Sequence, residues 1–292
     1  MSTTVKTRQA YRRTDDYTPG TPKVKLVTEH LPAELEPTAV LIKIHAVALN
    51  YRDANIANGG NPWPVTKNGV PGNDAAGEVI AVGEKVSLVK IGDRVAPITD
   101  SEFVTARSTA WSALKGASIG QTVLIQGTGG VSTFALKLAR ASGLKVILTS
   151  SSEEKLSTIK AQLGKPDILT VNYKTNPDWQ TEVLRLTNGV GVDLVVENGG
   201  SSSLVQSMQC TRRGGTVSQA GYLGGPKAEE LKEGINAGSK DDQDELMAAI
   251  SATQMTFDDI IDSVWSFDKA EEAIEYVWQG KQVGKVVIEI KE

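Results

Sequence analysis

The chain has 292 residues, 40% hydrophobic residues and a formal net charge of -4 at pH 7, which predicts a globular protein large enough for two domains. No basic cluster with interleaved aromatic residues occurs, so nucleic acid is not an expected partner. The polar N-terminus lacks the apolar segment of a secretory signal, and no run approaches the roughly 20 apolar residues that span a bilayer, so we expect a cytoplasmic protein outside the membrane.

Potential metal ligands are scarce, because the chain contains one cysteine, Cys210, and two histidines, His30 and His45. A lone cysteine cannot form an intrachain disulfide, and zinc sites usually draw on several Cys and His ligands. His45 lies in an alternating stretch where Lys43 shares its face, which is typical of a solvated strand histidine. The sequence therefore predicts no metal site.

The first hundred residues read as a mostly β region, with short apolar or alternating runs separated by Gly and Pro pairs. The predicted strands lie at 24–28, 40–49, 75–86 and 91–97.

Between 105 and 255 the pattern changes to apolar strands that alternate with helical stretches, which predicts βαβ units in a parallel sheet. The strands of this part lie at 122–127, 145–150, 192–199 and 215–221, and after 255 a helix at 268–280 precedes a closing strand at 285–290. The predicted fold class is α/β, with a doubly wound parallel sheet of the Rossmann type.

A glycine-rich turn follows the strand at 122–127 and precedes an amphipathic helix. Gly127 permits the tight turn, and Gly129, followed by Gly130, lets the backbone approach a pyrophosphate at the positive end of a helix that begins near Val131. Ser132 stands at the third glycine position, where a small residue permits close packing and a hydroxyl could cap the helix or bond a phosphate. A purely structural turn is the alternative.

The next strand ends in hydroxyl groups instead of the carboxylate that an NAD site places there. Ser150, Ser151, Ser152 and Lys155 suit the 2′-phosphate of NADPH, which requires hydrogen-bond donors and a cation. The alternative is a capping box formed by Ser151 and Glu154 at the next helix. We expect NADPH to be preferred over NADH.

Six segments together resemble the zinc-independent branch of the medium-chain dehydrogenase/reductases, the quinone oxidoreductase-like enzymes. The segments are ALNYRD (48–53), VPGNDAAGEVIAVGEKV (70–86), IGDRVAP (91–97), TAWSALKG (109–116), QGTGGVS (126–132) and GKVVIEI (284–290). The resemblance implies a twisted-barrel, GroES-like substrate domain at 1–105 and 255–292. It also implies an inserted Rossmann domain at 106–254.

The resemblance extends to individual positions. The first catalytic zinc ligand of the metal-dependent relatives falls on Asn50, and their second-motif His-Glu pair falls on Asn73 and Asp74, which implies chemistry without zinc. Asn50, Tyr51 and Asp53 would line the cleft near the nicotinamide, although Asp53 could equally serve the scaffold.

Two cofactor positions also come from the resemblance alone. It implies that Thr109 lies under the nicotinamide ring. It further implies that Tyr173 approaches the phosphate on the adenosine side.

The chain also departs from the family. Only residues 98–108 connect two motifs that several tens of residues separate in the family, and 235–238 stand where the family has a strand that often pairs two subunits. Omitted sequence, a shortened gene model and a natural reduced form are all open explanations. Monomer and homodimer both remain possible.

The expected function is that of an NADPH-dependent oxidoreductase that transfers hydride to a quinone, enone or carbonyl compound without zinc. The partner would then be a small-molecule substrate. The alternative is a reduced paralogue that binds the cofactor without catalysis, because a shortened cleft would not exclude water around the transferred hydride.

Overall fold

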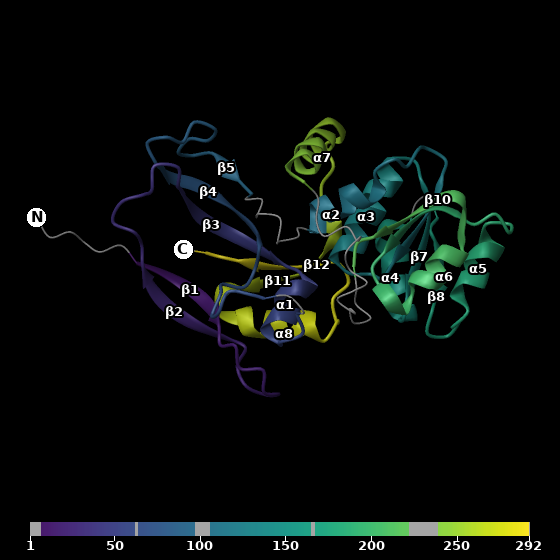
Figure 1. Cartoon of the computed structure of the whole chain (residues 1–292), viewed down its shortest axis with the longest axis horizontal. Helices are drawn as coiled ribbons and strands as arrows, with labels where there is room; N and C mark the ends of the chain where they lie inside the picture. Colours follow the sequence, from purple (N-terminus) through teal and green to yellow (C-terminus); the bar gives the residue numbers. More distant parts are fainter. Residues whose placement is uncertain (1–6, 62–63, 97–105, 165–166, 222–238, 292) are drawn as a thin grey trace, which may run out of the picture. The chain divides into compact units, whose positions relative to one another are not determined.

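The computed structural model describes residues 7–61, 64–96, 106–164, 167–221 and 239–291 of the chain. The chain divides into two compact units (Figure 1): the first comprises 1–98, 263–281 and 286–292, and the second comprises 99–262 and 282–285. The predicted domain boundary assigned 255–262 to the first domain, whereas contacts within the structure group these residues with the second unit. Within the described ranges, no helix is both long and apolar enough to cross a membrane.

The first unit is built on a five-stranded sheet in the order β11-β12-β3-β4-β5 and a separate antiparallel pair, β1 and β2. Its strands are β1 (Thr7–Arg13), β2 (Val24–His30), β3 (Val40–Leu49), β4 (Asp74–Val82), β5 (Arg94–Val95), β11 (Ile261–Ser266) and β12 (Lys285–Glu289). Helices α1 (Tyr51–Ala57) and α8 (Ala270–Trp278) contribute to its core. Short side chains on the two helices, including Ala54, Ala57 and Ala273, allow their close approach.

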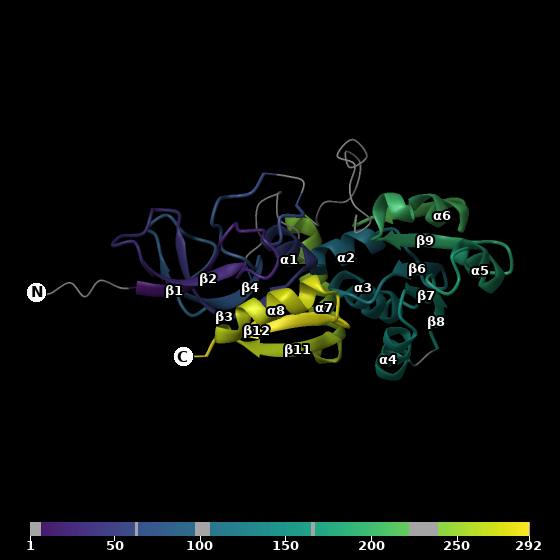
Figure 2. The ribbon, with the colours of Figure 1, turned by 90° about the horizontal axis from the view of Figure 1, so that it is seen from below.

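The second unit contains a parallel sheet in the order β10-β9-β6-β7-β8. Figure 2 shows β9, β6, β7 and β8 in this succession. Its strands are β6 (Thr122–Gln126), β7 (Lys145–Ser150), β8 (Leu169–Asn172), β9 (Val192–Glu197) and β10 (Thr211–Gln219). Its helices are α2 (Ala106–Leu114), α3 (Gly130–Ala141), α4 (Glu153–Leu163), α5 (Trp179–Leu186), α6 (Leu204–Gln209) and α7 (Lys240–Thr253). The strand order reverses direction at β6, so the crevice beyond the ends of β6 and β9 is the switch point where such sheets bind nucleotides.

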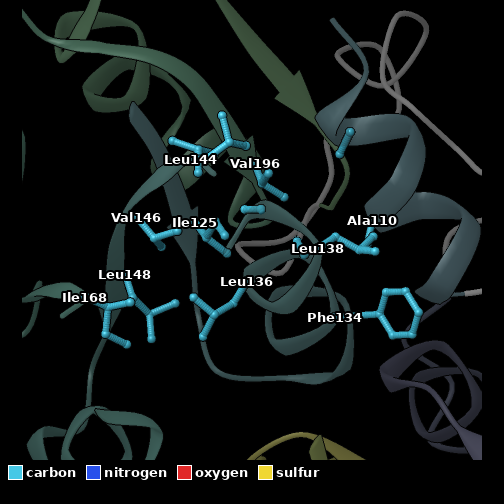
Figure 3. Close-up of a cluster of buried hydrophobic side chains, with 14 of the residues drawn as sticks. Ala110, Ile125, Phe134, Leu136, Leu138, Leu144, Val146, Leu148, Ile168 and Val196 are labelled. Carbon is cyan, nitrogen blue, oxygen red and sulfur yellow. The ribbon is translucent and has the colours of Figure 1, made fainter. Parts of the chain in front are cut away.

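Both faces of this parallel sheet are buried, which explains the nearly continuous apolar strands. Val123 and Ile125 face the core that α2, α3 and α4 cover, whereas Leu124 faces the core that contains α5. Figure 3 shows the first of these cores, where Leu136 and Leu138 of α3 gather against side chains of the strands. This packing fixes the carboxyl ends of β6 and β7, which carry the candidate cofactor residues.

The long predicted strand at 40–49 is confirmed as β3. Its side chains do not follow the regular alternation between the two faces of the sheet that the sequence pattern predicted. Its register with β4 shifts between Leu41 and Ile42 and again between Ile44 and Ala46. His45 is exposed at the second shift, and its Nε2 lies 3.9 Å from Oε2 of Glu78 on β4. The expected solvated histidine therefore has a glutamate neighbour that the alternation did not indicate.

The two connections that are shorter than in the family lie mostly outside the described residues. Of the first connection, 98–108, residues 98–105 are outside them, and so is all of the second, 235–238. Within the described ranges, β10 is the last strand on its side of the parallel sheet.

Candidate cofactor and active site

The glycine-rich turn is shaped to admit an anion at the start of α3. Gly127 has φ of +81°, a left-handed conformation that favours glycine, and its N–H donates to the Thr149 carbonyl at 2.8 Å. Gly129 is the N-cap of α3, supplies no side-chain cap, and a Cβ placed on it would meet no atom within 4 Å. The space that a Cβ would fill is open, so the turn fits a pyrophosphate that approaches the helix N-terminus.

The next residues of the turn serve packing. A Cβ on Gly130 would lie only 2.7 Å from Cδ of Lys285. Val131 is partly exposed in the first turn of α3, and the buried Ser132 hydroxyl donates to the Gln126 carbonyl at 2.6 Å. This hydroxyl therefore ties α3 to the end of β6, and its contact with a phosphate stays a prediction.

The three serines at the end of β7 and directly after it have different environments. Ser150 is buried, and its Oγ accepts from the Ser152 N–H at 3.2 Å. Ser152 is the N-cap of α4, where its Oγ accepts from the Lys155 N–H at 3.3 Å. The predicted cap at Ser151 is thus wrong by one residue, and Ser151 is the exposed member of the group.

Lys155 and Tyr173 lie close to these serines in the fold. The Lys155 ammonium donates to the Gln282 carbonyl at 2.9 Å, and burial lowers the pKa of this lysine, opposed by the nearby Asp262 carboxylate. Tyr173 directly follows β8, its ring is partly exposed, and its N–H donates to the Ser150 carbonyl at 3.0 Å. The ends of β7 and β8 therefore bring together residues that the sequence suggested separately.

A buried carboxylate at the switch point was missed by the sequence reasoning. Glu197 ends β9, and its side chain is fully buried. Its carboxylate accepts hydrogen bonds from Gly199 N–H (2.8 Å), Gly200 N–H (2.9 Å), Ser203 Oγ (2.6 Å), Gln126 Nε2 (2.7 Å) and Ser207 Oγ. The signal in the sequence was the polar pair Glu197-Asn198 at the end of an otherwise apolar strand.

Asn198 joins the same network to the glycine-rich turn. Its Nδ2 donates to the Gln126 carbonyl at 2.9 Å and to Ser132 Oγ at 3.2 Å. The loop after β9 and the turn after β6 are therefore held together by side chains at the switch point. This arrangement preorganises the edge of the sheet where a dinucleotide would lie.

In the first unit, Asn50 and Asp53 form the start of α1. Asn50 is the N-cap, and its N–H donates to Asp53 Oδ2 at 2.8 Å. The other carboxylate oxygen of Asp53 accepts from the Gly72 N–H at 3.1 Å, and the side chain is buried. Both oxygens hold backbone in place, which gives Asp53 a structural role at the start of α1.

This role predicts a stability defect. Replacing Asp53 with alanine leaves the Asn50 and Gly72 N–H groups without their acceptor, so we expect the free energy of unfolding to fall by about 1 to 3 kcal/mol. Urea denaturation measures this change, with the exposed Asp258→Ala as the matched control. An Asp53→Ala variant as stable as the control would contradict the assignment.

Tyr51 begins α1 and remains accessible. Its side chain is 40% exposed and stacks on Trp278 of α8, with ring centroids 6.1 Å apart and an interplanar angle of 19°. Partial burial raises the pKa of Tyr51 further above neutral pH, so the hydroxyl stays protonated, as in an ordinary tyrosine, and can donate a hydrogen bond. Thr109, in contrast, lies fully buried in α2 of the second unit.

Asn73 and Asp74 stand at the positions where the resemblance aligned a zinc-ligand pair of metal-dependent relatives. Asp74 is buried at the start of β4, beside Asn73 in the chain. The thiol of Cys210 is fully buried in the second unit, and burial raises its pKa to about 12, which keeps it protonated. Within the part of the chain that the structure describes, no three His, Cys, Asp or Glu side chains are grouped as metal ligands.

Two family descriptions match the sequence. "Alcohol dehydrogenase GroES-like domain" matches residues 36–141, and "Zinc-binding dehydrogenase" matches residues 130–236. The first match covers strands β3 to β5 of the first unit, and the second begins at the helix that follows the glycine-rich turn.

Similar proteins cover three quarters of the chain or more. A zinc-type alcohol dehydrogenase-like protein of Schizosaccharomyces pombe is 33% identical over 93% of this chain and 96% of its own length. A quinone oxidoreductase of Pseudomonas aeruginosa is 30% identical over 75% of this chain and 74% of its own length. The crystal structure of a putative alcohol dehydrogenase from Sinorhizobium meliloti superposes with a TM-score of 0.78 at 28% identity, over 97% of this chain and 99% of that one.

Proposed function

This chain belongs to the medium-chain dehydrogenase/reductase family, oxidoreductases that depend on a nicotinamide dinucleotide, and we propose that it uses NADPH, without zinc, to reduce a quinone, enone or carbonyl compound. The small-molecule substrate class is suggested by the quinone oxidoreductase among its relatives. The cofactor preference and the absence of zinc are argued from this chain's own residues.

The preference for NADPH rests on one observation, the group of hydroxyls at the end of β7. An enzyme that selects NADH places a carboxylate there to bond the ribose hydroxyls, and that carboxylate would repel a 2′-phosphate. Ser150 and Ser151 stand there instead, followed by the N-terminus of α4, and the backbone of Tyr173 hydrogen-bonds to Ser150 while that of Lys155 hydrogen-bonds to Ser152. The helix N-terminus and the cation both favour a doubly charged phosphate.

The proposed chemistry needs no metal ligand. The reduced nicotinamide supplies the hydride, and the protein orients the acceptor and stabilises the oxyanion that develops on it. The Tyr51 hydroxyl, which like any tyrosine hydroxyl is protonated at neutral pH, is the candidate donor to that oxygen. Asn50 is placed beside it by the start of α1, where zinc-dependent relatives have a metal ligand.

Ser151→Asp is expected to reverse the cofactor preference. Ser151 is exposed, so the new carboxylate adds charge without disturbing the fold. At a separation of about 4 Å and an effective dielectric constant near 20, two like charges repel by several kcal/mol, so NADPH affinity should fall at least tenfold. NADH affinity should be unchanged or increased, as measured by fluorescence titration.

The matched control for this variant is Ser157→Asp, an equal charge change at an exposed position further along α4. It should leave the ratio of NADPH to NADH affinity as in the wild type. Equal losses in the two aspartate variants, or an unchanged ratio in Ser151→Asp, would contradict the assignment of the 2′-phosphate to this group.

A second candidate function is supported by the length of the chain. The alignment with the Schizosaccharomyces pombe protein runs over 338 positions, whereas 93% of this 292-residue chain supplies only about 272 residues. The relative therefore has segments for which this chain has no counterpart. A reduced paralogue that binds the dinucleotide without turnover would account for this, and binding without substrate-dependent oxidation of NADPH would distinguish it.

A further inference from the structure

A cavity of about 760 Å³ lies within the first unit, between the loop that joins β1 to β2 and helix α8. Two contacts hold the loop against the helix, because the Glu271 carboxylate accepts from the Lys23 and Val24 N–H groups at 2.8 and 3.0 Å. The buried Lys23 ammonium in turn donates to the Asp16 and Thr18 carbonyls at 3.1 and 2.6 Å, which fixes the loop itself. The walls of the cavity are therefore preformed, as is usual for sites that bind small molecules.

Aromatic side chains from three parts of the first unit line this cavity. They are Tyr17 of the loop, Trp265 of β11, and Tyr276 and Trp278 of α8. The rings of Trp265 and Tyr276 contact each other with centroids 5.7 Å apart. The Trp278 ring stacks on Tyr51, and the Tyr17 ring lies over Gly59, where an added Cβ would be 2.7 Å from its Cγ. Because each ring is held by a neighbour, little conformational freedom would be lost when a ligand packs against them.

A partly buried carboxylate joins these rings on the cavity wall. Glu275 directly precedes Tyr276 on α8 and lies about one helical turn before Trp278. Its carboxylate accepts from the neutral side-chain amide of Gln279 at 2.6 Å. The face of an aromatic ring carries negative partial charge and attracts a cation, as a carboxylate does. The cavity is therefore suited to a positively charged ligand, and the same wall would repel an anion.

The remaining charged groups of the cavity wall do not reverse this preference. Glu271 and Glu272 add two carboxylates, and the second pairs with Lys269 at 3.0 Å. Of the two lysines that line the cavity, Lys23 directs its ammonium to the loop oxygens, and Lys281 is exposed to solvent, which screens its charge. The lining residues thus carry one more carboxylate than ammonium groups.

We propose that this cavity binds a small organic cation, whose quaternary ammonium group packs against the aromatic rings and faces Glu275. A quaternary ammonium carries methyl groups in place of N–H donors, so it can leave water without losing hydrogen bonds and can contact several rings at once. The residues of this site belong to the first unit, whereas the glycine-rich turn belongs to the second. The inference therefore goes beyond the proposed function and does not depend on it.

The test is a titration of the full chain with choline, followed by tryptophan fluorescence because Trp265 and Trp278 line the cavity. The comparison ligand is 3,3-dimethylbutan-1-ol, which has the shape of choline with a carbon atom in place of the charged nitrogen. Sodium chloride keeps the ionic strength constant. We expect choline to change the fluorescence saturably and the neutral alcohol to bind roughly tenfold more weakly. Equal affinities for the two ligands, or no saturable change with choline, would overturn the inference.

Three variants locate the site. Glu275→Gln removes the charge with little change of shape, so affinity for choline should fall about tenfold while affinity for the neutral alcohol stays the same. Tyr17→Leu removes a ring at an exposed position, leaves both tryptophans in place, and should weaken choline binding about three- to tenfold. The matched control is Glu84→Gln, the same change at an exposed position of the first unit outside the cavity wall, which should bind choline like the wild type. Equal losses in the two glutamine variants would show that only the overall charge matters, and would overturn the inference.

Discussion

Gly129→Ala is expected to weaken the binding of NADPH and NADH by about a hundredfold while the protein stays folded. The added methyl group enters the open space at the N-cap of α3, where the turn would admit the pyrophosphate. Losing two charge-assisted hydrogen bonds of about 1.5 kcal/mol each corresponds to this factor. Because φ at Gly129 is −84°, alanine fits the backbone, and the free energy of unfolding should change by less than about 1 kcal/mol.

Two other glycines serve as controls for this variant. Gly127→Ala forces a side chain into a left-handed conformation, so it should destabilise the fold by about 1 to 2 kcal/mol. Gly116→Ala introduces the same strain at a position after α2 with no atom near the new Cβ, so it should leave cofactor affinity intact. Titration and urea denaturation of the three variants separate the two effects. Wild-type affinity in Gly129→Ala would show that no phosphate approaches there.

Glu197→Ala is expected to lower the free energy of unfolding by several kcal/mol, because each buried donor left without its acceptor costs about 1 to 3 kcal/mol. The carboxylate accepts five hydrogen bonds and is fully buried. Alanine leaves the N–H groups of Gly199 and Gly200 and three side-chain donors without this acceptor in a site that water does not reach. Urea denaturation followed by circular dichroism measures the change.

The control for this variant is Glu182→Ala. Glu182 forms an exposed pair with Arg185 on α5, which should contribute less than about 1 kcal/mol. Glu197→Gln keeps one acceptor oxygen but adds donors that face other donors, so its loss should be intermediate. If Glu197→Ala and Glu182→Ala lost similar stability, the network at the switch point would not anchor the fold.

The second unit could be predicted from the sequence because its signals are local. The strands at β6, β7 and β9 are buried on both faces and read as apolar runs, and the turn between β6 and α3 requires its glycines. The serine hydroxyls at the end of β7 could also be located from the sequence, because they directly follow an apolar strand. The serine that caps α4 could not, because Ser151 has Glu154 three residues later, as the capping-box pattern requires, whereas Ser152 has Lys155 there, and yet the backbone path selects Ser152.

Elements stabilised by distant partners could not be predicted in this way. The strand β1 carries charged residues, and its arginines Arg8 and Arg12 pair with Glu29 on β2, so it shows no apolar alternation. The helix α1 has only seven residues, and its signal was the Asn50 and Asp53 pair at its start. The contact of Gly284 with Thr128 joins residues far apart in the sequence, and a single sequence carries no trace of it.

The proposed function is tested most directly by a paired titration of the purified wild-type chain with NADPH and NADH. It is followed by oxidation of the preferred nucleotide with a panel of quinones, enones and aldehydes, with and without a metal chelator. We expect tighter binding of NADPH and substrate-dependent oxidation that the chelator does not change. A chain that binds neither nucleotide, or that prefers NADH and loses its activity with the chelator, would contradict the proposed function.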